Sequence, residues 1–588
     1  MNTLTQNCQG RFLLAPRLAV VVLSLPVIRG FLSDSYPVSA DGVLHLMRAI
    51  AFDQAARTGD LWPRFLTPLH YGYGSPIYNY MGPLSLYPVE LLHLVGMGFI
   101  RAVLGATILY ILVGGLGAYQ LGEALDSPAA GIVAAVGFVY SASFAYFGNL
   151  AQYAALSFLP WALWALWALS THQKSRYLLL TVLFMSLPVM MHNISALIIA
   201  GLAVLVGAVL VILSRQRIKT LALLALAGVL VVGVTVFTWL PALAEQEYIR
   251  LDLLENFDFH TYFVPLAETM AFTPHPGAER ILLSADYTVH WPQLLLALTA
   301  LAVLFIPRRN EDAKVQSATR AWTGVCIGLF VLLLFLTTRV STAVWDAVPM
   351  MDLILFPSRL LSPASLFLAV AAGLGVSEVM HRVQVQPLRI ALLLVVLAAV
   401  IVYALPVIHV DYMNPNPPSE TVLDVHQIER DTGWLGATSA GEYRPRWAKD
   451  IYAWGLTDRY SQNSVIARLR TNEVIEVIHE NWGQKSVVLE LAASEETTLI
   501  FEWLYFPGWY AWVDGEPVEL RPTTPKGLVA LELPQGRHTV ELRFGLTPLR
   551  RAATWISLAS LTGLVMAAVL LPRYLPPEPQ PVHNDGAA

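Results

Sequence analysis

Long apolar runs recur along most of this chain at the length of membrane-spanning helices. A helix needs about 20 apolar residues to cross the hydrocarbon core of a bilayer. Twelve runs meet or approach that length, at residues 14–32, 99–123, 128–147, 152–171, 177–191, 194–214, 219–241, 290–307, 321–338, 360–379, 389–408 and 553–572. The pattern predicts a polytopic α-helical membrane protein with about twelve transmembrane helices.

A shorter apolar run, residues 81–96, is interrupted by Pro83 and Pro88. Proline disrupts a helix interior, so we expect an interfacial or re-entrant helix here, not a crossing. The main basic clusters then share one side of the membrane: Arg11 and Arg17, Lys174 and Arg176, Arg215, Arg217 and Lys219, and Arg308, Arg309 and Lys314. By the positive-inside rule, both termini are expected in the cytoplasm, and the working face outside the cytoplasmic (inner) membrane.

A different pattern fills residues 409–552, which are soluble in composition. Apolar and polar residues alternate in "SVVLELAA", "TTLIFEWLYF" and "HTVELRFG", and "VDGEP" supplies a hairpin turn. This alternation predicts a β-sandwich over 484–548, preceded by a helix near 418–430 and strands around 464–479. The expected organisation is a transmembrane domain (1–408) with a first outer loop (33–98), an extracytoplasmic α/β-to-β-sandwich domain (409–552), a last transmembrane helix (553–572) and a disordered cytoplasmic tail (573–588).

The amino-acid composition agrees with a protein that lies mostly in lipid. Of 588 residues, 56% are hydrophobic and 13% are charged, about half the charged share of soluble domains. The net charge of -5 indicates no nucleic-acid partner. The two cysteines, Cys8 and Cys326, are placed for neither a disulfide nor a metal site.

The first outer loop opens with three polar side chains at helical spacing. Asp41, His45 and Arg48 share one stripe, and Val43, Leu46, Met47 and Ile50 lie opposite, which predicts a helix on the bilayer surface. A carboxylate there can act as a general base, and a guanidinium can hold an anion. The alternative is that Asp41 caps the helix and the other two face water.

Aromatic residues crowd the rest of that loop. Residues 63–88 combine Arg64 with Tyr71, Tyr73 and Tyr78 among several prolines and glycines. Such a rigid aromatic loop is suited to stacking on a sugar or a lipid headgroup, although Tyr also forms aromatic belts at membrane interfaces. A second outer turn offers Asn149, Gln152 and Tyr153.

Three further features fall on the outer side. His192 interrupts two apolar runs, which indicates either a packed histidine or a site residue. Arg359 opens a spanning helix, where it can bind a phosphate or extend to the interface. The acidic loop 244–260 can hold Mg²⁺ or Mn²⁺ or can simply be solvated, and it shows no tight metal-ligand spacing.

Several of these motifs together resemble a known group. The run D41-x-x-x-H45, the stretches "GDLWPR" (59–64) and "GYGSP" (72–76), and later "FPSR" (356–359) and "GEYRP" (441–445) resemble bacterial multipass membrane proteins called 6-pyruvoyl-tetrahydropterin synthase-related. The stretch "YFPGWYAWVDGEPVEL" (505–520) is similar to the end of YfhO-type membrane proteins.

Both groups resemble the GT-C glycosyltransferases. That resemblance implies a sugar donor linked to a polyprenyl phosphate, Asp41 as the catalytic residue, and Arg48 or Arg359 as the holder of the lipid phosphate. His45, Arg64, Tyr71, Tyr73, Tyr78, Gln152 and His192 complete the expected substrate-binding set. Gly42 follows Asp41 where many such enzymes have a second acidic residue, which leaves the use of Mg²⁺ or Mn²⁺ open.

Two other classes compete with the transferase. One is a non-catalytic envelope protein that binds glycan through its β-domain, in which Trp503, Trp509 and Trp512 either grip a sugar or fill a core. The other is a transporter of lipid-linked glycan, which the mostly clean apolar runs disfavour. The expected partners are membrane lipid, a polyprenyl-phosphate-linked sugar and a glycan, lipid or protein acceptor.

Overall fold

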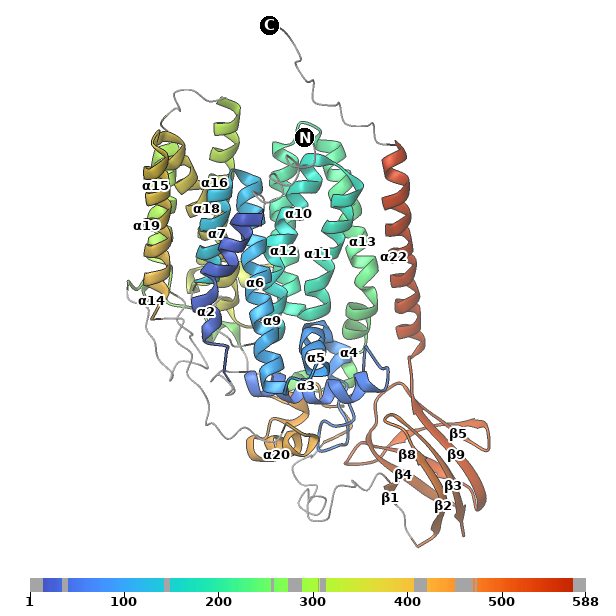
Figure 1. The fold of residues 1–588 in the computed structure, drawn as a ribbon. Coiled ribbons are helices and arrows are strands. Elements are labelled where there is room, and N and C mark those ends of the chain that lie inside the picture. The colour runs from blue at the N-terminus through green and yellow to red at the C-terminus, as the bar shows by residue number, and fades with distance from the viewer. Residues whose placement is uncertain are drawn as a thin grey trace, which may run out of the picture.

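The computed structural model describes residues 14–33, 41–141, 149–254, 258–272, 288–304, 306, 313–406, 420–449, 469–470 and 473–574. Most of the predicted tail, residues 575–588, lies outside this range. The remainder forms a helical bundle with a β-domain at one end (Figure 1). The predicted class, a polytopic helical membrane protein with a β-domain before its last helix, is confirmed.

Eight helices of the described chain are long and apolar enough to cross a membrane, and four shorter apolar helices accompany them. Each corresponds to one of the twelve predicted runs. In chain order these segments are Leu14–Leu23 with α2 (Leu25–Arg29), α6 (Phe99–Leu125), α7 (Pro128–Val139), α9 (Leu150–Ser157) with α10 (Leu159–His172), α11 (Ser175–Met191), α12 (Asn193–Leu213), α13 (Arg217–Ala244), α15 (Trp291–Leu304), α16 (Ala313–Leu336), α18 (Leu361–Arg382), α19 (Gln386–Ala404) and α22 (Pro548–Tyr574).

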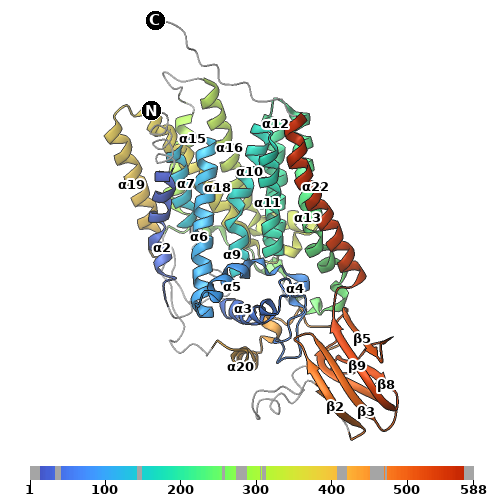
Figure 2. The same cartoon turned by 45° about the vertical axis from the view of Figure 1, so that its right-hand side comes forward.

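Short helices gather at the end of the bundle that carries the β-domain. Helix α3 lies across the ends of the spanning helices, with α4 and α5 between it and the bundle and α20 beyond it (Figures 1 and 2). These helices are α3 (Gly42–Arg57), α4 (Ile77–Tyr80), η1 (Pro83–Leu86), α5 (Tyr87–Leu94), η2 (Gln246–Tyr248), η3 (Leu251–Leu254), η4 (Phe259–Thr261), α14 (Leu266–Thr269), η6 (Arg339–Ser341), α17 (Thr342–Ala347), η7 (Asp352–Ile354), η8 (Pro357–Leu360), α20 (Val422–Thr432) and η9 (Leu435–Ala437). The run 81–96 thus forms η1 and α5, too short to span.

Close helix contacts hold the centre of the bundle together. Helix α7 packs on both α6 and α18, and small residues let these backbones approach. A Cβ on Gly131 would lie 2.6 Å from the Tyr119 carbonyl oxygen, and one on Gly373 would lie 2.4 Å from the Ala130 carbonyl oxygen. Larger residues at these positions would push the helices apart.

The β-domain is a sandwich of two antiparallel sheets. One sheet has the order β1-β4-β8-β7 and the other β2-β3-β9-β5-β6. The strands are β1 (Leu469–Arg470), β2 (Ile475–Trp482), β3 (Ser486–Ala493), β4 (Thr497–Leu504), β5 (Trp509–Val513), β6 (Glu516–Val518), β7 (Arg521–Pro522), β8 (Leu528–Leu533) and β9 (Gly536–Phe544). Because β1 pairs with β4 and β2 with β3, the sandwich begins earlier than the alternating pattern after residue 484 indicated.

Candidate functional site

Asp41 is the N-cap residue of α3, and its backbone carbonyl accepts a 3.1 Å hydrogen bond from the His45 N–H. Within the described chain its carboxylate makes no hydrogen bond to the first turn of the helix. Instead, Asp41 Oδ2 accepts a hydrogen bond of 2.9 Å from Asn149 Nδ2. Asn149 is itself the N-cap of α9, where its Oδ1 accepts from the Gln152 backbone N–H at 3.0 Å. The cap therefore fixes the amide so that its N–H group points at Asp41.

Helix α3 is not the amphipathic surface helix that the spacing predicted. His45 and Arg48 are only 1% and 6% exposed, and Met47 on the other face is fully buried. The helix is covered on one side by the bundle and on the other by α20 and η9. Its polar stripe consequently faces protein, where charged groups need partners or a ligand.

Two arginines are fixed in this buried region by backbone carbonyls. Arg48 donates from Nε and Nη2 to the Ala437 carbonyl oxygen, at 3.1 and 2.8 Å. Arg359 in η8 donates from Nη1 to the Ile354 carbonyl oxygen at 2.6 Å, and its guanidinium lies 4.9 Å from the centre of the Phe356 ring. Since a carbonyl oxygen carries no net charge, the contact with Ala437 leaves Arg48 able to hold an anion.

Two histidines lie beside these arginines in their neutral form. Burial, followed by the charges of Arg359 and Arg48, lowers the pKa of His192 to about 3. Burial, followed by Arg48 and His192, also lowers the pKa of His45 well below its usual value. His192 Nδ1 accepts a 3.1 Å hydrogen bond from the Ser195 backbone N–H, capping α12. The neutral ring therefore carries its proton on Nε2, which makes that atom a donor.

The charge of Arg48 acts on three more polar groups. The Tyr78 hydroxyl is buried and has no hydrogen-bond partner in the described chain, and burial raises the pKa of Tyr78. The charge of Arg48 also acts on Glu442 and Tyr443, from the "GEYRP" stretch. The site thus joins the first outer loop to residues 437–443, with Arg48 at its centre.

Six of the predicted residues meet in this site, namely Asp41, His45, Arg48, Tyr78, His192 and Arg359. Sequence reasoning missed Glu442, although the motif that contains it was recognised. The outer turn contains both Asn149 and Gln152, and the prediction names Gln152 as the binding residue. In the structure the Gln152 backbone N–H donates to the cap of α9, and the Asn149 amide contacts Asp41.

Arg64 belongs to a separate buried network. Its Nη1 donates to Asn79 Oδ1 at 3.1 Å and its Nη2 to the Phe237 carbonyl oxygen at 2.5 Å. Asn79 in turn donates to Glu245 Oε2, which also accepts from Arg550. Burial, then the charge of Arg550, lowers the pKa of Arg64 to about 10, so it stays charged at neutral pH. This network fastens the first loop to α13 and α22.

Tyr71 and Tyr73 pack away from the site, in the apolar core shared by the first loop and the β-domain. Trp503 and Trp509 fill the same core, with ring centres 4.8 Å apart. Trp512 is half-buried, and the Arg543 guanidinium lies 4.8 Å from its ring centre. Two of the three tryptophans that were weighed as sugar contacts are therefore core residues.

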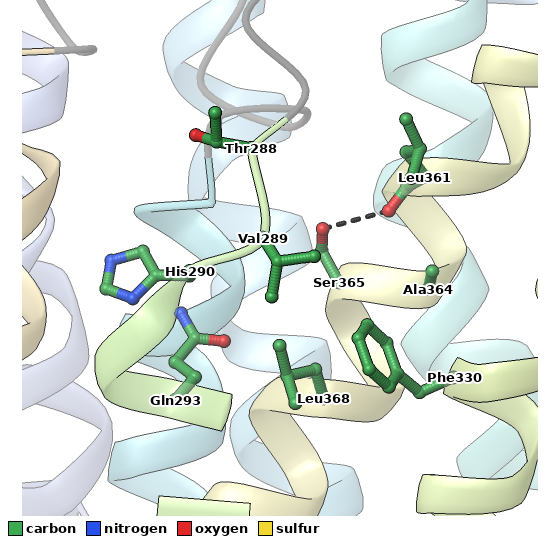
Figure 3. Close-up of a pocket in the computed structure, with 9 residues that line it drawn as sticks. All are labelled: Thr288, Val289, His290, Gln293, Phe330, Leu361, Ala364, Ser365 and Leu368. Atoms are coloured by element: carbon green, nitrogen blue, oxygen red, sulfur yellow. Dashed lines mark hydrogen bonds between the residues drawn. The ribbon is translucent and has the colours of Figure 1, made fainter. Parts of the chain in front are cut away.

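A small cavity lies between the ends of α15, α16 and α18, just beyond η8 (Figure 3). Its wall is part polar and part apolar, with Gln293 turned toward it and the Ser365 hydroxyl bonded to the Leu361 carbonyl. Its lining residues are Thr288, Val289, His290, Gln293, Phe330, Leu361, Ala364, Ser365 and Leu368. Gln293 Nε2 donates to the Gly137 carbonyl of α7, so these polar groups serve the packing of the bundle.

Metal ligands do not gather in the described chain. It contains no group of three or more His, Cys, Asp or Glu side chains that could hold an ion. In the acidic loop, His260 pairs with Asp258 and Asp346, and all three side chains are about half exposed. The residues of the candidate site, two arginines among them, fit an anion better than Mg²⁺ or Mn²⁺.

Fold and site together define a polytopic membrane protein with a largely buried site of arginines and carboxylates at the β-domain end of its bundle. The chain belongs to the family described as 6-pyruvoyl-tetrahydropterin synthase related domain, membrane protein, whose model matches residues 78–410. The matched region includes His192 and Arg359, but it leaves out Asp41, Arg48 and Glu442. No curated protein matches the chain.

Solved structures resemble the chain only in part. The oligosaccharyltransferase of Archaeoglobus fulgidus has a TM-score of 0.38 at 13% identity, over 71% of this chain and 57% of that one. The arabinofuranosyltransferase AftD from Mycobacteria has a TM-score of 0.40 at 18% identity, over 72% of this chain and 28% of that one. ArnT from Cupriavidus metallidurans has a TM-score of 0.31 at 13% identity, over 63% of this chain and 78% of that one.

Proposed function

We propose that this protein is an integral membrane glycosyltransferase that moves a sugar from a polyprenyl-phosphate carrier to an acceptor. The observation that carries the proposal is the Asp41 carboxylate, which makes no cap hydrogen bond to its own helix and is held by Asn149 instead. It lies one helical turn from His45 and two from Arg48. A base and a fixed cation are what sugar transfer from a phosphate requires.

The proposed reaction uses these groups in one step. Asp41 takes the proton of an acceptor hydroxyl, and the acceptor oxygen forms a bond to the anomeric carbon of the donor sugar. The bond between that carbon and the phosphate oxygen breaks, and its electron pair leaves with the polyprenyl phosphate. Arg48 and Arg359 stabilise the charge that develops on the phosphate, because their positions are already fixed by backbone carbonyls.

The neighbours of these groups have supporting roles. Asn149 positions the Asp41 carboxylate toward the acceptor, since its own orientation is set by the cap of α9. His192 offers a neutral N–H to a phosphate or sugar oxygen without adding charge. A lipid-borne donor suits this site because His192 and Arg359 lie where helices long and apolar enough to span the membrane begin.

The test is complementation of a strain that lacks the gene with wild type, Asp41→Asn or Asp252→Asn, an exposed control. Mass spectrometry would measure lipid-linked sugars and surface glycans at matched protein levels. We expect wild type and the control to restore a glycan. Asp41→Asn should lower transfer by about 10²-fold or more and let the lipid-linked donor accumulate, because the amide cannot accept the proton. Full complementation by Asp41→Asn would reject the base and favour the non-catalytic envelope protein.

We also propose that the β-domain end of the bundle is extracytoplasmic and that both termini face the cytoplasm of the inner membrane. Glu476 in β2 and Gln216 between α12 and α13 are exposed at opposite ends of the bundle. In a background with Cys8 and Cys326 replaced by serine, Glu476→Cys should react with an impermeant maleimide in intact cells. Gln216→Cys should react only after permeabilisation, and the reverse pattern would invert the orientation.

A further inference from the structure

The backbone around Glu442 is fixed against the loop that follows α13. The Glu442 carbonyl oxygen accepts a 3.1 Å hydrogen bond from the Arg250 N–H, and Arg446 N donates to the Tyr248 carbonyl at 3.0 Å. Ile249 and Pro445 form a β-bridge between these two contacts. These backbone contacts therefore fix the position of Glu442 in the fold.

The carboxylate of Glu442 is held only in part, by the backbone N–H groups of Glu442 and Ala440 and by the Thr438 hydroxyl. Its Oε2 atom is buried and has no hydrogen-bond partner within the described chain. Arg48 lies close enough for its charge to act on Glu442, yet its Nε and Nη2 atoms donate to the Ala437 carbonyl. Burial raises the pKa of Glu442, and Arg48 and the Thr438 hydroxyl offset only part of that rise. A buried carboxylate oxygen without a partner is costly to keep and needs a reason.

The residue that follows Glu442 belongs to an aromatic stack. Tyr443, the next residue, stacks on Tyr80 with ring centres 5.8 Å apart and an angle of 16° between planes. The charge of Arg48 also acts on the Tyr78 hydroxyl, which is buried and has no hydrogen-bond partner within the described chain. A carboxylate with one unpaired oxygen, near aromatic residues, suits a ligand with several hydroxyl groups.

We propose that Glu442 recognises the sugar of the donor by accepting hydrogen bonds from its hydroxyl groups. This inference rests on the proposed function and adds a specificity-determining residue to it. Arg48, whose charge acts on Glu442, would hold the phosphate, and the donor sugar is attached directly to that phosphate. Asp41, with Asn149, would then face the acceptor on the other side of the anomeric carbon.

The test measures binding by the purified full-length protein in lipid nanodiscs. The probes are undecaprenyl phosphate and its glucose, galactose, mannose and arabinose derivatives, with affinities obtained by native mass spectrometry. We expect one derivative to bind wild type at least 10-fold more tightly than undecaprenyl phosphate. Glu442→Gln should lose most of that preference and keep its affinity for undecaprenyl phosphate within 2-fold. Glu476→Gln, an exposed carboxylate in β2, is the matched control and should behave as wild type.

The other outcomes separate this inference from the proposed function. If wild type binds none of the probes, the proposed function fails. If wild type binds them all equally, or if Glu442→Gln keeps the preference, the function stands and the sugar contact is rejected. An equal loss for undecaprenyl phosphate would show that Glu442 acts only through Arg48. If Glu442→Gln does not fold, Glu442→Asp gives the same comparison, with a preference reduced at least 3-fold.

Discussion

The Asn149 amide forms one hydrogen bond through its oxygen and another through its nitrogen, and the two bonds have different roles. The oxygen caps α9 and the nitrogen donates to Asp41. Asparagine and aspartate are equally good N-caps, whereas only asparagine can donate a hydrogen bond. Capping and positioning can therefore be separated by substitution at a single site.

Asn149→Asp should keep the cap and place a second carboxylate against Asp41. We expect the thermal unfolding midpoint to stay within about 2 °C of wild type, because the cap is retained. Transfer activity should fall about 10-fold or more, since the two carboxylates repel one another and Asp41 loses its orientation. Asn149→Ser, which caps but cannot reach Asp41, is the control for the lost donor. Unchanged activity in both variants would leave Asn149 a structural cap only.

At the scale of elements, a buried carboxylate of α20 holds the backbone of the first loop. Glu429 accepts from the backbone N–H groups of His70, Tyr71 and Gly436, at 2.7, 2.6 and 2.8 Å. His70 and Tyr71 both have positive φ angles, 52° and 55°, which turn their N–H groups toward the same acceptor. The unusual backbone and the buried carboxylate depend on each other.

This contact predicts a pH dependence of stability. Burial raises the pKa of Glu429 to about 7, although three N–H groups oppose the rise. Between pH 4.5 and 7 the folded protein therefore binds a proton that the unfolded chain releases, and this contribution to stability is lost as the pH rises. The midpoint of thermal unfolding of the wild-type protein should fall between pH 5 and pH 8. This fall should be smaller in Glu429→Gln and the same as in wild type in Asp431→Asn, the exposed neighbour on α20.

Glu429→Gln should also lower the midpoint at every pH, because its amide N–H group would face a backbone donor. A variant with wild-type midpoints and an unchanged pH profile would contradict the role given to Glu429.

The protonation of His70, in the same part of the fold, changes stability with pH in the opposite direction. Burial, and then Arg444, lowers the pKa of His70 to about 3, so its contribution to stability is lost as the pH falls below about 6.5.

At the scale of the whole molecule, one ion pair connects the bundle, the first loop and the last helix. Arg550 in α22 donates from Nε and Nη2 to Glu245 Oε2, at 3.0 and 2.8 Å, and both side chains are buried. Glu245 also accepts from Asn79 Nδ2 and Thr547 Oγ1. Arg550 further lies 5.1 Å from the Phe506 ring centre, on the β-domain.

Removing one member of this pair should cost more than removing both. Arg550→Met leaves Glu245 buried without its cation and should destabilise the protein by about 3 kcal/mol. The double variant Glu245→Gln/Arg550→Met should recover about half of that loss, since no uncompensated charge remains. Thermal unfolding in detergent measures both. A double variant that is no more stable than Arg550→Met would show that hydrogen bonding, and not charge, dominates this contact.

Sequence patterns were sufficient for the elements. Each of the twelve apolar runs corresponds to a helix, because lipid requires every backbone group of a span to be bonded within its own helix. Period-two alternation likewise indicated the β-sandwich, because residues of one face share a core. The predicted start of the β-sandwich at residue 484 leaves out β2. The side chains of β2 are mostly exposed, so this strand shows little alternation of apolar and polar residues.

The residue types of the site were also visible in the chain, since a carboxylate, a guanidinium and an imidazole stand out beside apolar runs. What the sequence could not decide was which of them meet. The pairing of Asp41 with Asn149, 108 positions apart, and the closeness of Arg48 to Glu442 depend on how the loops fold over the bundle. For the same reason, periodicity placed the stripe of α3 in water, because helical spacing shows which residues share a face but not what covers that face.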